Sequence, residues 1–318
     1  MNIRAALKEG LARLREAHTP SFTLAAELLL LHVIGRDRAW LYAHPEDELF
    51  PEDAARYRQL LARRAAGEPT QHLTGKQEFW GLEFEVTPDV LIPRPETEHL
   101  IEIALDRLAV RELRAGRQQK TQGEGLRIAD VGTGSGCIAI ALAHELPAAT
   151  IFATDTSPAA LAVARRNAQH HNVSDRIHFI ECNLLDALPV GARHAVPRTA
   201  VGAVPLQPSG ASHESPLLDL IVSNPPYIGQ REAASLPREV RDHEPASALF
   251  GGEEGYELCA ALVTEAAARL APGGLLVLEL GHDSLPAVRP LFDTPAWTSV
   301  AVTNDLAGIP RVIAAEHQ

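Results

Sequence analysis

Cysteine is scarce in this chain, and its spacing argues against two kinds of site. The three cysteines, Cys137, Cys182 and Cys259, lie far apart and form no C-x-x-C pair. An odd number without such spacing disfavours a disulfide framework and a structural zinc site. The 14 histidines show no H-E-x-x-H or similar ligand pattern either. We therefore expect no bound metal, and a reducing compartment, the cytoplasm, fits this composition best.

Long apolar runs and a secretory signal are also missing. The most apolar segments, Leu24–Ile34 and Leu275–Leu280, are too short to cross a bilayer, and polar or charged residues interrupt them. The first residues lack an apolar core because charged residues interleave with the apolar ones. The sequence therefore predicts a protein without a membrane partner.

Positive charge is in deficit. Lys and Arg number 29 against 41 Asp and Glu, which gives a formal net charge of −12. A broad nucleic-acid-binding face needs Lys and Arg against phosphate, so we expect no direct nucleic-acid partner, although a local basic patch stays open. The 318 residues, 46% of them hydrophobic, suffice for one large or two ordinary domains and exclude a wholly disordered chain.

The apolar pattern divides the chain into three parts. Residues 1–75 have helical periodicity and no strand pattern, which predicts a small all-helical domain. Residues 76–92 alternate briefly around Gly81, which predicts a β-hairpin linking two domains. We interpret residues 93–318 as the larger domain.

Within residues 93–318, strand-like and helix-like runs alternate, which predicts a mostly parallel α/β sheet with helices on both faces. The expected strands are Arg127–Val131, Thr150–Thr154, Arg176–Ile180, Leu218–Ser223 and Leu275–Leu280. Two late runs, Thr298–Asn304 and Arg311–Ala315, are expected to form an antiparallel edge. Residues 111–125 and 189–216 lack periodicity, so we expect mobile loops there.

A glycine-rich segment follows the first expected strand and opens a helix, where backbone N–H groups approach ligands in α/β folds. Its G-x-G-x-G spacing differs from the G-x-G-x-x-G of dinucleotide sites, which argues against NAD. Asp130, just before it, suits a ligand bearing an ammonium group, such as the methionine part of S-adenosylmethionine. The residues assigned to cofactor binding here are Asp130, Val131, Gly132, Thr133 and Gly134.

The ends of the next two strands complete the expected cofactor site. Asp155 follows the glycine loop by about 20 residues, where a carboxylate can accept hydrogen bonds from ribose hydroxyls. The third strand ends near Asn183 and Leu184, where the adenine is expected. Each of these residues alone is common in ordinary turns, but their occurrence in this order at successive strand ends favours a site for a nucleotide-like cofactor.

The fourth strand is followed at once by Asn224, Pro225, Pro226 and Tyr227. Two prolines stiffen this loop, because they can neither extend a central strand nor enter a helix interior. The Asn224 side-chain oxygen and the Pro225 carbonyl can accept hydrogen bonds from an NH2 group while Tyr227 stacks on its plane. The loop therefore predicts a site for a planar group with an amino nitrogen, although alone it could be an ordinary Asx-Pro turn.

The glycine loop together with Asn224–Tyr227 resembles the class I S-adenosylmethionine-dependent methyltransferases that modify planar amino groups. Further segments resemble the HemK/PrmC family, the peptide chain release factor glutamine methyltransferases. In chain order they are Glu78–Gly81, Leu91–Glu98, Arg241–Gly252 and Asp305–Val312. The segment at Cys182–Leu185 departs from the family pattern, and the insertion at 189–216 is longer than expected.

This resemblance implies a Rossmann-like class I fold and transfer of methyl from S-adenosyl-L-methionine, leaving S-adenosyl-L-homocysteine. The implied acceptor is the side-chain amide nitrogen (N5) of the glutamine in the Gly-Gly-Gln motif of release factors. It also implies that residues 1–75 hold the release factor, and we expect a monomer. The implied catalytic residues are Asn224, Pro225, Pro226 and Tyr227, with Asn224 also contacting the cofactor.

Three other interpretations stay open at this point. A nucleic-acid methyltransferase acting on adenine N6 or guanine N2 would use the same loop but would want a basic face. A ribosomal-protein glutamine methyltransferase shares the loop but usually carries a different block at Arg94–Thr97. A cofactor-binding scaffold without activity is disfavoured by the intact Asn224–Tyr227 loop.

Overall fold

The N-terminal part of the molecule is a bundle of helices. The computed structural model describes residues 1–114, 123–188 and 217–318. The helices are α1 (Ile3–Glu16), α2 (Phe22–Ile34), α3 (Arg38–Ala43), α4 (Pro51–Ala65) and α5 (Thr70–Thr74). Their apolar faces pack around the buried side chains of Leu61 and Tyr57. The Tyr57 hydroxyl donates to the Ala26 backbone oxygen at 3.1 Å, which joins α4 to α2.

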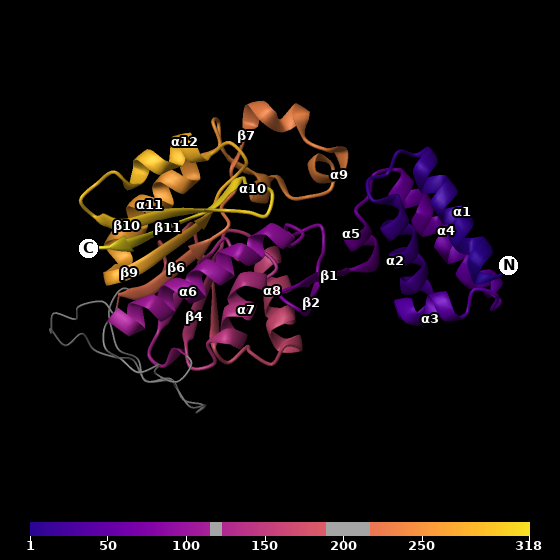
Figure 1. The fold of residues 1–318 in the computed structure, drawn as a ribbon, viewed down its shortest axis with the longest axis horizontal. Helices are drawn as coiled ribbons and strands as arrows, with labels where there is room; N and C mark the ends of the chain where they lie inside the picture. The colour runs from indigo at the N-terminus through magenta and orange to yellow at the C-terminus, as the bar shows by residue number, and fades with distance from the viewer. Residues whose placement is uncertain (115–122, 189–216) are drawn as a thin grey trace.

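A β-hairpin connects this bundle to the rest of the chain. Strands β1 (Lys76–Phe79) and β2 (Leu82–Glu85) pair antiparallel, and the turn between them includes Gly81 at a φ of +68°. Phe79 and Phe84 are fully buried in the same apolar cluster as the helices of the larger domain. The hairpin therefore packs on the larger domain, and the helical bundle lies beyond it at one end of the molecule (Figure 1).

Within the described residues, the main sheet has seven strands in the order β10-β11-β9-β6-β3-β4-β5. The strands are β3 (Arg127–Val131), β4 (Thr150–Asp155), β5 (Ile177–Glu181), β6 (Leu218–Ser223), β9 (Leu270–Glu279), β10 (Trp297–Asn304) and β11 (Pro310–His317). Strands β5, β4, β3, β6 and β9 are parallel, and β11 pairs antiparallel with both β9 and β10. The strand order reverses between β3 and β6, which is where open α/β sheets bind ligands.

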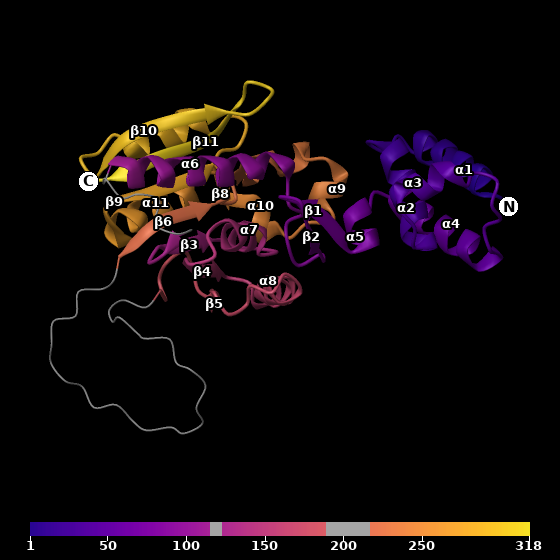
Figure 2. The same cartoon turned by 60° about the horizontal axis from the view of Figure 1, so that its bottom comes forward.

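Helices cover both faces of this sheet (Figures 1 and 2). One apolar cluster joins the sheet to α6 (Glu98–Arg114), α7 (Cys137–Glu145) and the end of α8 (Pro158–His170). A second cluster, on the opposite face, joins it to α11 (Glu257–Arg269) and α12 (Leu285–Val288). Because helices cover both faces, the side chains on both faces of the central strands are buried, and these strands are continuous apolar runs in the sequence. No helix within the described ranges is long and apolar enough to span a membrane.

Short elements complete the edge of the sheet where the parallel strands end. They are η1 (Pro95–Thr97), β7 (Ile228–Gly229), η3 (Gln230–Ser235), α9 (Arg238–Arg241), α10 (Ala246–Leu249) and β8 (Phe250–Gly252). A further short helix, η4 (Arg289–Phe292), continues α12 on the face of the sheet. Strand β7 pairs in parallel with β8. The Arg64 guanidinium of α4 contacts the Glu239 carboxylate of α9 at 2.7 Å, so an ion pair joins the helical bundle to this edge.

The expected fold class is confirmed, including the antiparallel edge, the helical N-terminal part and the hairpin. Most strand ends differ from the expected ones by at most two residues, and two boundaries were wrong by more than that. Strand β9 begins at Leu270 rather than Leu275, and the loop expected at 111–125 begins later because α6 continues to Arg114. The Arg111 guanidinium contacts the Asp219 carboxylate of β6 at 2.8 Å and holds the last turn of α6 in place. The rest of that loop from residue 115 to 122, and all of 189–216, lie outside the described residues.

The hairpin yields a test of the fold. Replacing the fully buried Phe84 with alanine removes a ring from the core shared with α7 and leaves a cavity. We expect Phe84→Ala to lower the free energy of unfolding by about 3–5 kcal/mol in urea denaturation. Leu306→Ala is the control, because Leu306 is 98% exposed and its loss is expected to change that energy by less than about 0.5 kcal/mol. Equal losses for both variants would contradict the placement of the hairpin.

Candidate active site

The glycine loop after β3 is hydrogen-bonded to the end of the neighbouring strand, β4. Gly132, Gly134 and Gly136 have φ values of +73°, +54° and +82°, the left-handed region that glycine enters without a steric cost. The backbone N–H groups of Gly132 and Thr133 both donate to the Thr154 oxygen of β4 at 2.9 Å. The Gly134 N–H donates to Asp155 Oδ2 at 2.9 Å. The loop therefore holds a curved backbone at the junction of β3 and β4.

Asp130 lies beneath this loop, with no exposed surface. Its Oδ2 accepts a hydrogen bond from Thr133 Oγ1 at 2.6 Å and another from the Ala139 N–H of α7 at 3.1 Å. Its Oδ1 is buried and has no hydrogen-bond partner among the described residues. Burial raises the pKa of this carboxyl to about 7. The side chain thus orders the loop and leaves one acceptor oxygen unsatisfied.

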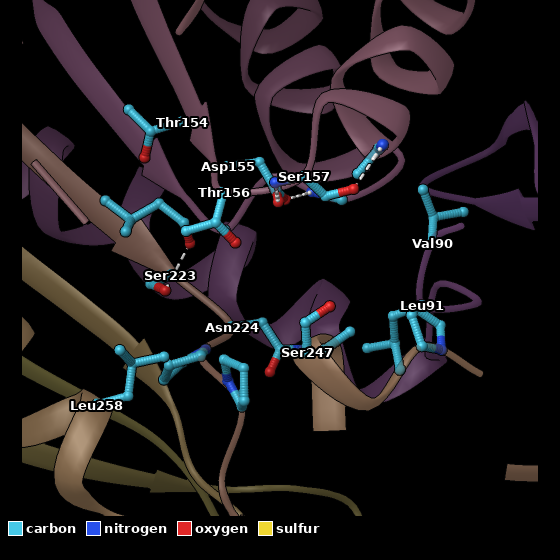
Figure 3. A pocket seen from close by; sticks show the side chains of 18 of the residues that line it. Val90, Leu91, Thr154, Asp155, Thr156, Ser157, Ser223, Asn224, Ser247 and Leu258 are labelled. Atoms are coloured by element: carbon cyan, nitrogen blue, oxygen red, sulfur yellow. Dashed lines mark hydrogen bonds between the residues drawn. The ribbon is translucent and has the colours of Figure 1, made fainter. Parts of the chain in front are cut away.

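A pocket opens above the loop at the carboxyl ends of β3, β4, β5 and β6. Its space between protein atoms, including the part that is open to solvent, is about 750 Å³. Figure 3 shows Asp155 and Ser157 on one side of this space and Asn224 and Ser247 on the other. The expected site residues that line it are Val131, Gly132, Gly134, Asp155, Asn183, Leu184, Asn224, Pro225 and Pro226.

Three of the expected site residues do not line this pocket: Asp130, Thr133 and Tyr227. Other residues line it that were not predicted from the sequence. They include Val90, Leu91, Ser157, Pro245, Ser247 and Leu258. Two signals could have found most of them. Ser157 is the N-cap residue of α8, and its hydroxyl accepts from the Ala160 N–H at 3.1 Å. Leu91, Pro245 and Ser247 belong to segments that carry the family resemblance.

The amide of Asn224 sits at the end of β6 and is held from outside the loop. Its Nδ2 donates to Thr97 Oγ1 of η1 at 3.1 Å. The Thr97 hydroxyl in turn donates to Glu279 Oε2, at the end of β9, at 2.6 Å. Thr97 and Glu279 are 3% and 2% exposed, so water has little access to either group. Because Nδ2 of Asn224 is bonded to Thr97, its Oδ1 is the atom of the amide that faces away from Thr97.

Close glycine contacts hold the rest of the Asn224–Tyr227 loop. A Cβ at Gly251 of β8 would lie 2.2 Å from the Pro226 oxygen, and a Cβ at Gly281 would lie 2.7 Å from Cδ2 of the Tyr227 ring. Neither position tolerates a side chain without displacing the loop. Burial raises the pKa of the Tyr227 hydroxyl to about 12, so the ring stays neutral.

Ion pairs bring the remaining family segments to the same place. The Arg94 guanidinium, just before η1, pairs with the buried Glu244 carboxylate. Burial raises the pKa of Glu244, while Arg94 opposes that shift. Arg311, at the start of β11, pairs at 3.0 Å with Asp305 in the turn that follows β10, and it also donates to the Leu280 oxygen, beside Gly281, at 3.1 Å. Segments far apart in the sequence therefore converge around Asn224–Tyr227.

The sheet, its antiparallel edge and the pocket at its parallel strand ends define a methyltransferase of the Rossmann-like class. One family model, the PrmC N-terminal domain, matches residues 5–75. A second, ribosomal protein L11 methyltransferase (PrmA), matches residues 107–193. The catalytic domain of hMettl16, solved in complex with the MAT2A 3′UTR hairpin 6, has a similar fold, with a TM-score of 0.51 at 18% identity over 81% of each chain.

Curated relatives identify the family. The release factor glutamine methyltransferase of Koribacter versatilis is 41% identical over 313 residues, which cover 98% of each chain. That of Bradyrhizobium diazoefficiens is 39% identical over 315 residues, covering 99% of this chain and 94% of the relative. The chain therefore belongs to the release factor glutamine methyltransferase family.

The buried Asp130 carboxyl yields a pH-dependent prediction for the protein without ligand. Because its pKa is raised to about 7 in the folded chain, the unfolded chain releases this proton at lower pH than the folded chain does. The free energy of unfolding should therefore fall as the pH rises from 5 to 7, by up to about 1 kcal/mol per pH unit. Asp130→Asn removes this contribution, so its stability should decline less over the same range.

Urea denaturation of both proteins at several pH values measures the difference. Asp106→Asn, on the exposed face of α6, serves as the matched control and should follow the parent. Parallel pH curves for the parent and Asp130→Asn would contradict the prediction.

Proposed function

We propose that this protein transfers a methyl group from S-adenosyl-L-methionine to the N5 amide nitrogen of the glutamine in the Gly-Gly-Gln motif of peptide chain release factors. The observation that carries the proposal is the pocket position of Asn224 and Pro225, on a stiff loop whose amide is held by Thr97. Membership of the release factor glutamine methyltransferase family supports the same substrate. We further propose that the protein acts in the cytoplasm as a monomer.

The residues around the pocket fit the proposed cofactor, which when bound supplies an electrophilic methyl group on a sulfonium centre. A Cβ added at Gly132 or Gly134 would have no heavy atom within 4 Å, so the backbone there is open to a ligand. Each Asp155 oxygen accepts one backbone N–H and keeps a lone pair for a ribose hydroxyl. Asp130 does not line the pocket, so it would act on the cofactor through the glycine loop that it orders from beneath. Asn183 and Leu184 would contact the adenine.

The chemistry on the acceptor side is limited by the amide itself. An amide nitrogen is a weak nucleophile, because its lone pair is delocalised into the carbonyl. Asn224 Oδ1 and the Pro225 carbonyl would accept from the two N–H groups of the glutamine and aim its lone pair at the reacting carbon. The methylated nitrogen is strongly acidic and can release its proton to water, so the site needs no strong base. Alignment and prearranged polar groups therefore supply most of the rate.

The helical bundle would hold the body of the release factor. Helices α1 to α5 lie at one end of the molecule, beyond the hairpin and α9 (Figure 2). The glycines of the substrate motif would allow the glutamine to reach a narrow pocket, while the bundle contacts a more distant part of the same partner. An acidic enzyme, with a net charge of −12, is also suited to a partner that has basic surfaces.

Labelled S-adenosylmethionine and a purified release factor test this proposal. We expect transfer to the parent release factor and loss of transfer when the glutamine of its Gly-Gly-Gln motif is changed to alanine. Equal labelling of both would contradict the proposed acceptor. Labelling of RNA or DNA that nuclease treatment abolishes would instead favour a nucleic-acid methyltransferase, and cofactor binding without any transfer would favour an inactive scaffold.

Asn224→Ala separates the catalytic role of the amide from cofactor binding. Removing Oδ1 removes one of the two acceptors that align the glutamine, so we expect kcat to fall by about 100-fold or more. Cofactor affinity, measured by calorimetry, should change by less than about fivefold. Asn304→Ala, at an exposed position of β10, is the control and should retain activity. A loss of cofactor binding that accounts for the whole loss of activity would make Asn224 a cofactor contact only.

A further inference from the structure

We propose that Thr97 and Glu279 are positioning residues that orient the Asn224 amide for methyl transfer. This inference rests on the proposed function, because it assigns the task of those two residues to the glutamine acceptor. Three elements meet here: η1 supplies Thr97, β9 supplies Glu279, and Asn224 follows β6. Two hydrogen bonds, of 3.1 and 2.6 Å, join the three side chains in a line.

The direction of these hydrogen bonds follows from the chemistry of the last member. An ionised carboxylate only accepts hydrogen bonds, so Glu279 takes the single hydrogen of the Thr97 hydroxyl. Thr97 Oγ1 is then left with lone pairs and can only accept from Asn224. The amide must therefore turn its Nδ2 towards Thr97, which directs Oδ1 to the other side. The carboxylate thus sets the orientation of an amide that it does not touch.

Burial makes this orientation costly to change. Neither Thr97 nor Glu279 is more than 3% exposed, so water cannot readily replace a lost partner. Burial raises the pKa of Glu279 to about 7, with Glu96 adding to the shift and Arg311 and Arg94 opposing it. Tyr227 faces the same carboxylate, which contributes to the raised pKa of its hydroxyl. At about pH 8.5 the carboxyl is ionised and acts only as an acceptor.

An inverted amide would be the wrong partner for the proposed substrate. If the Asn224 NH2 faced the pocket, a donor would meet the NH2 of the glutamine, and the substrate would lose one of its two acceptors. A site built to accept a particular hydrogen bond discriminates strongly when that bond cannot form. Loss of the hydrogen bonds from Thr97 to Glu279 and from Asn224 to Thr97 should therefore lower kcat without weakening cofactor binding.

Three variants test this inference with labelled cofactor and release factor at about pH 8.5. Thr97→Val removes the hydroxyl at nearly constant shape, and Thr97→Ser restores it. Glu279→Gln keeps the shape but can offer an NH2 to Thr97, which frees the hydroxyl hydrogen to donate to Asn224 Oδ1 and turn the amide. We expect kcat to fall by about tenfold or more for Thr97→Val and Glu279→Gln, and by less than about threefold for Thr97→Ser.

The other readouts separate positioning from folding. Melting temperature and cofactor affinity, measured on the same full-length proteins, should stay close to the parent for Glu279→Gln and Thr97→Ser. Parent-like kcat in both Thr97→Val and Glu279→Gln would overturn the inference, as would a loss of cofactor affinity that matches the loss of kcat. If the parent enzyme transfers no methyl to the release factor, the proposed function fails and the inference fails with it. If the parent transfers methyl and the variants match it, the proposed function stands and only the inference is wrong.

Discussion

The hydrogen bond between Asn224 Nδ2 and Thr97 Oγ1 joins positions that are 127 residues apart in the chain. For this contact to form, the ends of β6 and β9 and the short helix η1 must all be held at one edge of the sheet. The ion pairs of Arg94 with Glu244 and Arg311 with Asp305, and the close approach of Gly251 to Pro226, serve that arrangement. Much of the packing at this edge therefore supports the orientation of a single amide.

The fold and the sequence carry different information about the substrate. The fold is shared with the hMettl16 catalytic domain, which was solved in complex with the MAT2A 3′UTR hairpin 6, so the fold by itself does not name a substrate. The loop chemistry is equally permissive, since any planar NH2 group satisfies two acceptors. What assigns the chain to the release factor glutamine methyltransferases is its identity of about 40% to them over nearly its whole length. The net charge of −12 agrees with that assignment but is too coarse to decide it.

Local sequence predicted most of the sheet because the strands are apolar runs bounded by turn residues; Arg127–Val131 and Leu218–Ser223 have the expected bounds. Residues 111–114 were expected in a loop but form the last turn of α6, because this turn is polar and depends on a contact of Arg111 with Asp219. The sequence shows that Asp130 precedes the glycine loop, but it does not show that the Asp130 side chain lies beneath the loop. The partnership of Thr97 with Glu279, 182 residues apart, has no local signal at all.

The most direct measurement uses NMR on a release factor whose glutamine side chains carry 15N, methylated by this enzyme with 13C-methyl S-adenosylmethionine. We expect a new methyl carbon signal split by one-bond coupling to 15N, which disappears when the glutamine of the Gly-Gly-Gln motif is replaced. A methyl signal without that coupling would place the methyl on another atom. That result would contradict transfer to the glutamine amide, as would coupling that persists in the glutamine-replaced protein.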